Sequence, residues 1–189
     1  DKFPVPGPSL GLTLADRLIL PGIWRFTRLG YSASRRHWKP LSAYIVRRRA
    51  LVTGATSGVG LAAAQALAAL GASVTLIARD EQKARAIVGE MRRETGNPDI
   101  QVEICDMSMM ADVHQLADRL IAAGEPIDIL VNNAAVPMHR PIYQISAEEA
   151  EEVMRINFLS SLWTSFAAIP HMLIQGEAIL MFWADYSIL

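Results

Sequence analysis

A glycine-rich segment at residues 53–60, TGATSGVG, constrains the fold of this chain more than any other feature. A short apolar run ends in this segment, and a stretch rich in alanine and leucine follows it. A strand that turns at once into a helix needs positive φ or bare backbone, which Gly54, Gly58 and Gly60 supply. The N-terminus of that helix then presents unpaired N–H groups to a diphosphate, while a tight turn without a ligand is the alternative.

Short apolar runs alternate with longer stretches of helical pattern along the rest of the chain. The expected strands are Ala50–Thr53, Ser73–Ala78, Ile100–Ile104, Ile127–Asn132 and Ala178–Phe182. The expected helices are Leu61–Leu70, Glu81–Thr95, about Met109–Ala123, and one that Ser146 and Glu149 open as a capping box and that runs to about Ala168. This order predicts an α/β fold: a doubly wound, Rossmann-like parallel sheet that binds ligands at the carboxyl edge of its strands.

The charge of the chain is divided unevenly between its two ends. Residues 1–50 carry a net charge of +8 and residues 51–189 a net charge of −9, although the whole chain has −1. We therefore expect a basic, amphipathic N-terminal arm at residues 1–49 and a dinucleotide-binding α/β domain at residues 50–189. Through residues 10–49, the arm is expected to pack on its own domain, to bind an anionic membrane surface or to dock on a protein complex. An acidic body without a nucleic-acid-binding motif predicts no nucleic-acid partner.

Cysteine and histidine usage limits the chemistry of the chain. Cys105 is the one cysteine, which excludes an internal disulfide and a cysteine-based zinc site. The histidines are scattered and predict no metal site. No apolar run reaches the ~18 residues of a membrane span. We expect an intracellular, reducing compartment, with peripheral membrane association or an organellar location left open.

Four motifs in the α/β segment occur in a characteristic order. They are the glycine-rich segment, Asp106 after the third strand, Asn132-Asn133-Ala134-Ala135 after the fourth strand, and Asn157 in the next helix. With these motifs, residues 50–182 resemble the short-chain dehydrogenase/reductase family of the classical type. The resemblance implies a nicotinamide dinucleotide cofactor and hydride transfer to or from a carbonyl or secondary alcohol.

The resemblance also implies a role for individual residues. Asp106 would bond the adenine amino group with Met107 beside it, and Asn157 would stand in the place of the family's active-site asparagine, the one catalytic residue present. Asn132 is expected to tie two strands together. The remaining cofactor-binding residues implied are Thr53, Gly54, Thr56, Ser57, Gly58, Val59, Gly60, Asn133, Ala134 and Ala135.

Arg79 bears on the choice of cofactor. Members of the family that bind NAD tend to place an acid at the end of the second strand, where this chain has Ala78 followed by Arg79. A guanidinium pairs with a 2′-phosphate, which only NADP carries. NADP(H) is therefore the preferred cofactor and NAD(H) the alternative. Otherwise, Arg79 would form a surface ion pair with Asp80 or Glu81.

The remaining catalytic residues of the family are absent from this sequence. Trp183-Ala184 stand where the family has serine, and no Tyr-x-x-x-Lys motif is present, although Tyr186 and Ser187 follow closely. The predicted sheet is thus incomplete at its C-terminal side, with an apolar edge at the fifth strand that an oligomer or a partner would cover. We expect an oxidoreductase that is inactive as written. The alternative is a non-catalytic, nucleotide-binding accessory subunit.

Overall fold

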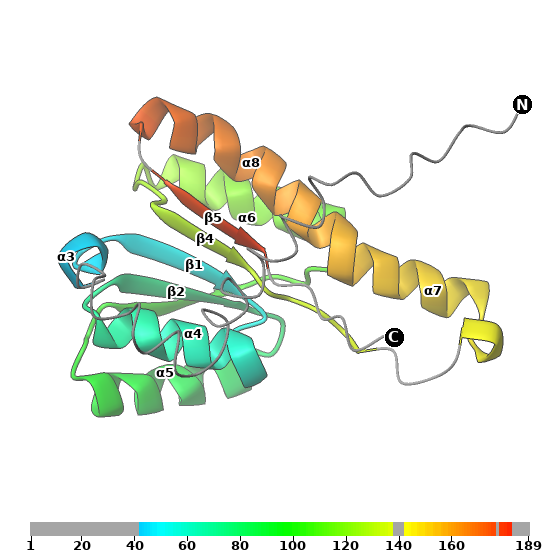
Figure 1. The fold of residues 1–189 in the computed structure, drawn as a ribbon, viewed down its shortest axis with the longest axis horizontal. Coiled ribbons are helices and arrows are strands. Elements are labelled where there is room, and N and C mark those ends of the chain that lie inside the picture. The colour runs from blue at the N-terminus through cyan, green and yellow to red at the C-terminus, as the bar shows by residue number, and fades with distance from the viewer. Residues whose placement is uncertain (1–41, 138–141, 177, 183–189) are drawn as a thin grey trace, which may run out of the picture. The chain divides into compact units, whose positions relative to one another are not determined.

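The computed structural model describes residues 42–137, 142–176 and 178–182 (Figure 1). Most of the predicted arm, together with Trp183, Ala184, Tyr186 and Ser187, lies outside these residues. The strands are β1 (Arg49–Thr53), β2 (Ser73–Ala78), β3 (Ile100–Ile104), β4 (Ile129–Asn132) and β5 (Ile179–Phe182). The helices are α3 (Ser42–Ile45), α4 (Gly58–Ala69), α5 (Glu81–Thr95), α6 (Met110–Ala122), the 3₁₀ turn η1 (Ile142–Gln144), α7 (Ala147–Met154), the π-helical turn η2 (Arg155–Leu159) and α8 (Ser160–Gln175).

The five strands form one parallel sheet in the order β3-β2-β1-β4-β5. Ala50 of β1 lies between Val74 of β2 and Ile129 of β4. The chain moves outward on one side from β1 through β2 to β3, and on the other side from β4 to β5. The direction therefore reverses between β1 and β4, and ligands of such sheets bind outside the carboxyl ends of the strands at this point. The predicted doubly wound architecture is confirmed.

Helices cover both faces of the sheet. α4 and α5 lie on one face, and α6 and α8 lie on the other (Figure 1). Each face has its own apolar core, with Val52 and Leu76 buried on the first and Leu51 and Ile77 on the second. The side chains of successive strand residues point to opposite faces, which is why a continuous apolar run in β1 or β2 serves both cores.

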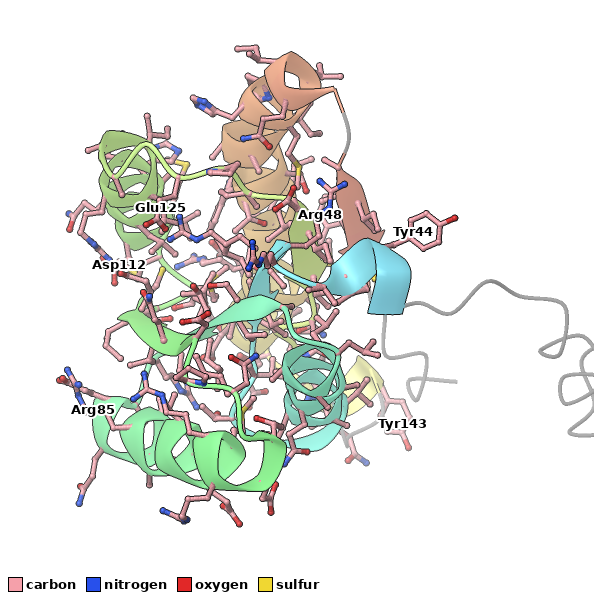
Figure 2. The ribbon with its side chains drawn as sticks, turned by 90° about the vertical axis from the view of Figure 1, so that its left-hand side faces the viewer. Tyr44, Arg48, Arg85, Asp112, Glu125 and Tyr143 are labelled. Atoms are coloured by element: carbon pink, nitrogen blue, oxygen red, sulfur yellow. The ribbon has the colours of Figure 1, made fainter. Side chains whose placement is uncertain are left out.

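Residues 42–49, which the prediction assigned to the arm, belong to the α/β unit. Ile45 of α3 is 4% exposed in the first core. Arg48 and Arg49 form ion pairs with Asp128 and Glu125. Figure 2 looks onto the amino ends of the strands and shows Arg48 and Glu125 there. Basic character alone could not separate these buried or paired residues from a solvated arm.

The start of β4 is also later than predicted. The side chain of Asp128 accepts hydrogen bonds from the Arg48 guanidinium at 2.7 Å and from the Arg49 N–H at 2.8 Å. Asp128 therefore fastens the turn that precedes β4 to the start of β1, and the strand begins only at Ile129.

The helical segment after β4 is longer than the predicted end at Ala168. The capping box of Ser146 and Glu149 is confirmed at the start of α7. The helix then continues through η2 and α8 to Gln175, with Pro170 inside it, and Gly176 ends it in the left-handed conformation. Proline usually ends or kinks a helix, yet this helix continues past Pro170.

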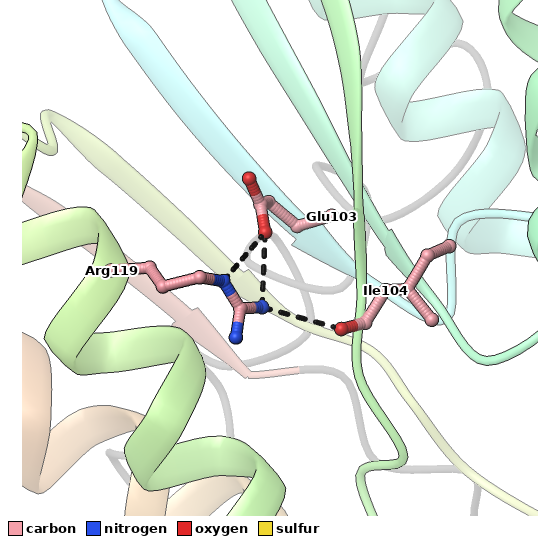
Figure 3. Close-up of polar contacts among 3 residues, drawn as sticks. All are labelled: Glu103, Ile104 and Arg119. Atoms are coloured by element: carbon pink, nitrogen blue, oxygen red, sulfur yellow. Dashed lines mark hydrogen bonds and ion pairs between the residues drawn. The ribbon is translucent and has the colours of Figure 1, made fainter.

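Arg119 joins the last turn of α6 to β3 (Figure 3). Its guanidinium donates to the Glu103 carboxylate at 3.1 Å and to the Ile104 carbonyl at 3.4 Å. Because Glu103 and Ile104 lie at the end of β3, this contact holds α6 close to the carboxyl edge of the sheet.

Candidate functional site

A cleft of about 550 Å³ lies where the carboxyl ends of β1, β2, β3 and β4 meet. The sequence-predicted residues that line it are Gly54, Thr56, Ser57, Gly58, Val59, Arg79, Asp106, Met107, Asn133, Ala134 and Ala135. The fold thus brings together residues from four strand ends that are far apart in the sequence. Their individual roles stay predictions.

The glycine-rich turn forms one wall of the cleft. Gly54 and Gly58 adopt φ values of +63° and +54°, which side chains other than glycine rarely adopt. α4 begins at Gly58 rather than at the predicted Leu61, so its first turn lies at the cleft. Ser57 precedes the helix, but its hydroxyl makes no capping hydrogen bond. The N–H groups of this turn and the Ser57 hydroxyl are therefore available to an anion.

Gly60 lies behind the cleft wall and does not line the cleft, and its predicted place at the cofactor stays a prediction. A Cβ atom placed on it would lie 2.6 Å from the Gly54 carbonyl oxygen and closer still to the Asn133 side-chain amide. The close approach of α4 to the ends of β1 and β4 therefore leaves no room for a side chain at position 60.

Thr53 likewise does not line the cleft, and its predicted place at the cofactor stays a prediction. Its buried hydroxyl accepts hydrogen bonds from the N–H groups of Asn133 and Ala134, both at 2.9 Å, and donates to the Val131 carbonyl at 3.4 Å. The Asn133 amide donates to the carbonyls of Thr53 and Gly54 at 3.2 and 3.3 Å. This network fastens the end of β1 to the end of β4.

The charged end of the cleft is formed by Arg79, Lys83 and Asp106. Asp106 accepts hydrogen bonds from the Ser108 N–H at 2.9 Å and from its hydroxyl at 2.7 Å. These two bonds, with a smaller contribution from the Arg79 cation, lower the pKa of Asp106 despite its partial burial. The side chain is therefore an anion at neutral pH, with one oxygen held by Ser108.

Arg79 has neither of the ion pairs considered for it. Asp80 caps α5 by accepting a hydrogen bond from the Lys83 N–H at 2.9 Å, and Glu81 pairs with Arg85. Arg79 is exposed and forms no ion pair with another described residue. Its guanidinium thus stays available at the cleft, next to the Lys83 side chain.

Asn157 lies in the π-helical turn η2, and its side chain clamps the loop that follows β4. Its Oδ1 accepts a hydrogen bond from the Val136 N–H at 2.8 Å, and its Nδ2 donates to the Val136 carbonyl at 3.0 Å. Val136 and the neighbouring Ile156 line the cleft, whereas Asn157 does not. The structure thus gives Asn157 a loop-positioning role, and its predicted catalytic role stays a prediction.

Asn132 ties a strand to a helix, whereas the sequence predicts that it ties two strands together. Its Oδ1 accepts a hydrogen bond from the Thr164 hydroxyl at 2.6 Å, and its Nδ2 donates to the Ser165 hydroxyl at 3.2 Å. These buried contacts hold α8 on the sheet directly below the cleft.

Cys105 forms part of the cleft floor but is poorly suited to react. Its thiol is buried, and desolvation, with the negative charge of Asp112 adding to it, raises its pKa to about 11. The thiol is therefore protonated at neutral pH and is a weak nucleophile.

Lys83, Ser108, Val136 and Ile156 are cleft residues that sequence reasoning missed. Lys83 had a detectable signal, because it lies in the first turn of the helix that follows the second strand. The others are placed by the course of loops and of η2, which no sequence pattern indicated.

The described residues hold no group of three or more histidine, cysteine, aspartate or glutamate side chains that could bind a metal ion. Within the same residues, no helix has the length and apolar character needed to cross a membrane.

Known proteins share this fold and its cleft-forming segment. A family model described as short chain dehydrogenase matches residues 48–182. An 11-beta-hydroxysteroid dehydrogenase-like 2 protein of Arabidopsis thaliana is 31% identical over 164 residues, which cover 85% of this chain and 51% of that protein. The D-erythrulose reductase of Gallus gallus is 35% identical over 129 residues, covering 68% of this chain and 48% of the reductase. The chain thus spans about half the length of these curated relatives.

Two solved structures agree with the chain in fold and in part of its sequence. A metagenomic short-chain oxidoreductase in complex with NADP has a TM-score of 0.68 and 30% identity, covering 73% of this chain and 62% of the other. A gluconate 5-dehydrogenase from Burkholderia cenocepacia in complex with NADP and tartrate has a TM-score of 0.66 and 31% identity, covering 72% and 53%.

Proposed function

This chain belongs to the short-chain dehydrogenase family, and from that premise we propose that its cleft binds NADP(H) and that the protein is an oxidoreductase. The observation that carries the proposal is that one cleft contains both the N-terminus of α4 and two cations. These cations, Arg79 and Lys83, form no ion pair with another described residue. The helix N-terminus suits a diphosphate and the cations suit a further phosphate.

The glycine-rich turn fits a dinucleotide diphosphate. A Cβ atom on Gly58 would meet no other atom within 4 Å, so the space in front of this residue is open. A ligand can therefore approach the backbone of the first turn of α4, whose N–H groups have no partner within the helix. Thr56 and Ser57 also line this part of the cleft and add two hydroxyl groups.

The cations at the end of β2 favour NADP(H) over NAD(H). Ala78 stands where a carboxylate would accept a hydrogen bond from the ribose 2′-OH of NAD, and Asp80 is engaged in capping α5. Arg79 and Lys83 both line the cleft and together offer +2 to a 2′-phosphate. The two solved relatives with 30% and 31% identity are complexes with NADP, which supports the same assignment.

The chemistry follows from the family. A bound nicotinamide supplies or accepts a hydride, and the substrate proposed is a carbonyl compound or secondary alcohol. The 189 residues contain no serine at the end of the fifth strand and no Tyr-x-x-x-Lys motif to handle the accompanying proton. Because general acid catalysis contributes typically ~10²–10⁴-fold, we propose that this chain alone binds the cofactor without measurable turnover.

The test is a fluorescence titration of the full chain with NADPH and with NADH. We expect NADPH to bind at least tenfold more tightly. In the variant Arg79→Gln, NADPH should bind about tenfold more weakly while NADH changes less than twofold. Arg85→Gln is the matched control, because Arg85 is an exposed arginine on the neighbouring helix that does not line the cleft.

The outcomes separate the parts of the proposal. Equal affinity for the two nucleotides, or an equal effect of the two substitutions, would refute the role of Arg79. If neither NADPH nor NADH binds, the proposal that the cleft is a cofactor site is refuted. Steady oxidation of NADPH with a panel of aldehydes and ketones would refute the proposed lack of turnover.

A further inference from the structure

A second cavity lies on the face of the sheet covered by α6 and α8, away from the glycine-rich turn. It has a volume of about 360 Å³. Leu51, Ile77 and Leu130 of the strands form its floor, and α6 and α8 form its sides. Among the described residues, only Ile77 lines both this cavity and the nucleotide cleft. The two sites therefore share one buried side chain.

The cavity exists because α8 presents small side chains to α6. Ala167 and Ala168 of α8 line the cavity opposite Leu116 and Leu120 of α6, and the alanines do not fill the space between the helices. An aliphatic cavity of about 150 Å³ is known to stay dry and to bind benzene. By the same measure this cavity accommodates roughly fourteen non-hydrogen atoms.

One end of the cavity is polar and open to solvent. Glu125, His171 and Gln175 line it, and Glu125 and Gln175 are exposed, whereas the residues of the floor are buried. The side chains of His171 and Gln175 form no hydrogen bond with another described residue, so both are available to a ligand. Glu125 is paired with Arg49, so neither of these charges is free to bind an ionic head group.

From this geometry we propose that the cavity is a second binding site, for an uncharged amphiphile. The ligand has an alkyl chain of about ten carbons in the aliphatic part and one hydroxyl or amide head group beside His171 and Gln175. The proposal does not depend on the cofactor assigned to the other cleft, because the ligand contacts a different face of the sheet.

The test uses isothermal titration of the full chain with 1-decanol, and with decanoate as the anionic analogue. We expect saturable binding of one 1-decanol per chain and at least tenfold weaker binding of decanoate. Ala167→Leu places a larger side chain in the cavity and should weaken 1-decanol binding at least tenfold. Ala122→Leu is the matched control, because Ala122 is exposed on α6 and does not line the cavity.

A second variant keeps the test decisive if Ala167→Leu does not fold. His171→Phe changes a partly exposed residue at the opening, and we expect it to weaken 1-decanol binding at least fivefold. The proposal is overturned if 1-decanol does not saturate or if both cavity variants bind like Ala122→Leu. Competition between 1-decanol and NADPH would also overturn it, because the alcohol would then occupy the nucleotide cleft. Equal affinity for decanoate and 1-decanol would refute the proposal that the head group of the ligand is uncharged.

Discussion

Substitution of Gly60 by alanine tests whether the back of the cleft holds the fold together. Gly60 lies in the first turn of α4, where alanine would ordinarily favour the helix by about 1 kcal/mol. Here the added methyl group would lie 2.6 Å from the Gly54 carbonyl oxygen and would collide with the Asn133 amide. The first of these neighbours is backbone and cannot rotate away.

The cost follows from the contacts that must give way. The Asn133 amide donates two hydrogen bonds, to the carbonyls of Thr53 and Gly54, and each contributes about 0.5–1.5 kcal/mol. Overpacking of a well-filled site adds about 1–3 kcal/mol. After the gain in helix propensity, we expect Gly60→Ala to lower the free energy of unfolding by about 1–5 kcal/mol, against the ~5–15 kcal/mol typical of a domain.

Urea unfolding followed by far-ultraviolet circular dichroism measures this loss. Gly96→Ala is the control, because Gly96 ends α5 with φ +69° and a Cβ atom there would meet nothing within 4 Å. We expect that control to cost about 1 kcal/mol from backbone strain alone. If Gly60→Ala proves no more destabilising than Gly96→Ala, the close contact between α4 and the strand ends is not the reason for glycine at position 60.

Three further predictions concern stability. Arg47 has φ +64°, so Arg47→Gly should relieve strain and raise the free energy of unfolding by about 1 kcal/mol; a lower urea midpoint would contradict this. Asp128→Asn weakens the charge-assisted bonds to β1 and should cost about 1–3 kcal/mol, whereas the exposed control Asp118→Asn should change the midpoint little. Folding raises the pKa of Cys105 from 9.0 to about 11, so its neutral thiol favours the folded state fully below pH 9, and this advantage is lost as the pH rises towards 11. Measured between pH 8 and 11, stability should therefore fall more steeply in the natural chain than in Cys105→Ala, and parallel profiles would refute the shift.

The regular elements could be predicted because each depends on a local pattern. β2, β3 and α5 have the residue ranges expected from the sequence, since apolar runs and the Asp80 and Gly96 caps mark both ends. The junction at residues 42–49 could not be predicted, because its place depends on ion pairs with Asp128 and Glu125, about eighty residues away. Local composition contains no information about such partners.

The sequence predicted which segments meet at the cleft, but not which of their residues line it and which lie behind it. The motif residues are indeed close together, because parallel strand ends meet at one edge of the sheet. Sequence spacing could not separate Gly58, which borders the open cleft, from Gly60, which is required by packing. Nor could it show that the amide of Asn157 both donates to and accepts from the Val136 backbone.

The residues behind the cleft wall are held by hydrogen bonds, whereas polar groups that face the cleft are not. This difference affects how the cleft binds a ligand. Behind the wall, the Thr53 hydroxyl makes three hydrogen bonds and the Asn133 amide makes two, so the ends of β1 and β4 are fixed before any ligand arrives. In front, Ser57 and Arg79 have polar groups without a partner among the described residues. The backbone around these groups is already ordered by the fold. A ligand that binds them therefore loses little free energy to ordering the backbone. Substitutions behind the wall should thus change stability and affinity together, whereas substitutions of Ser57 or Arg79 should change affinity alone.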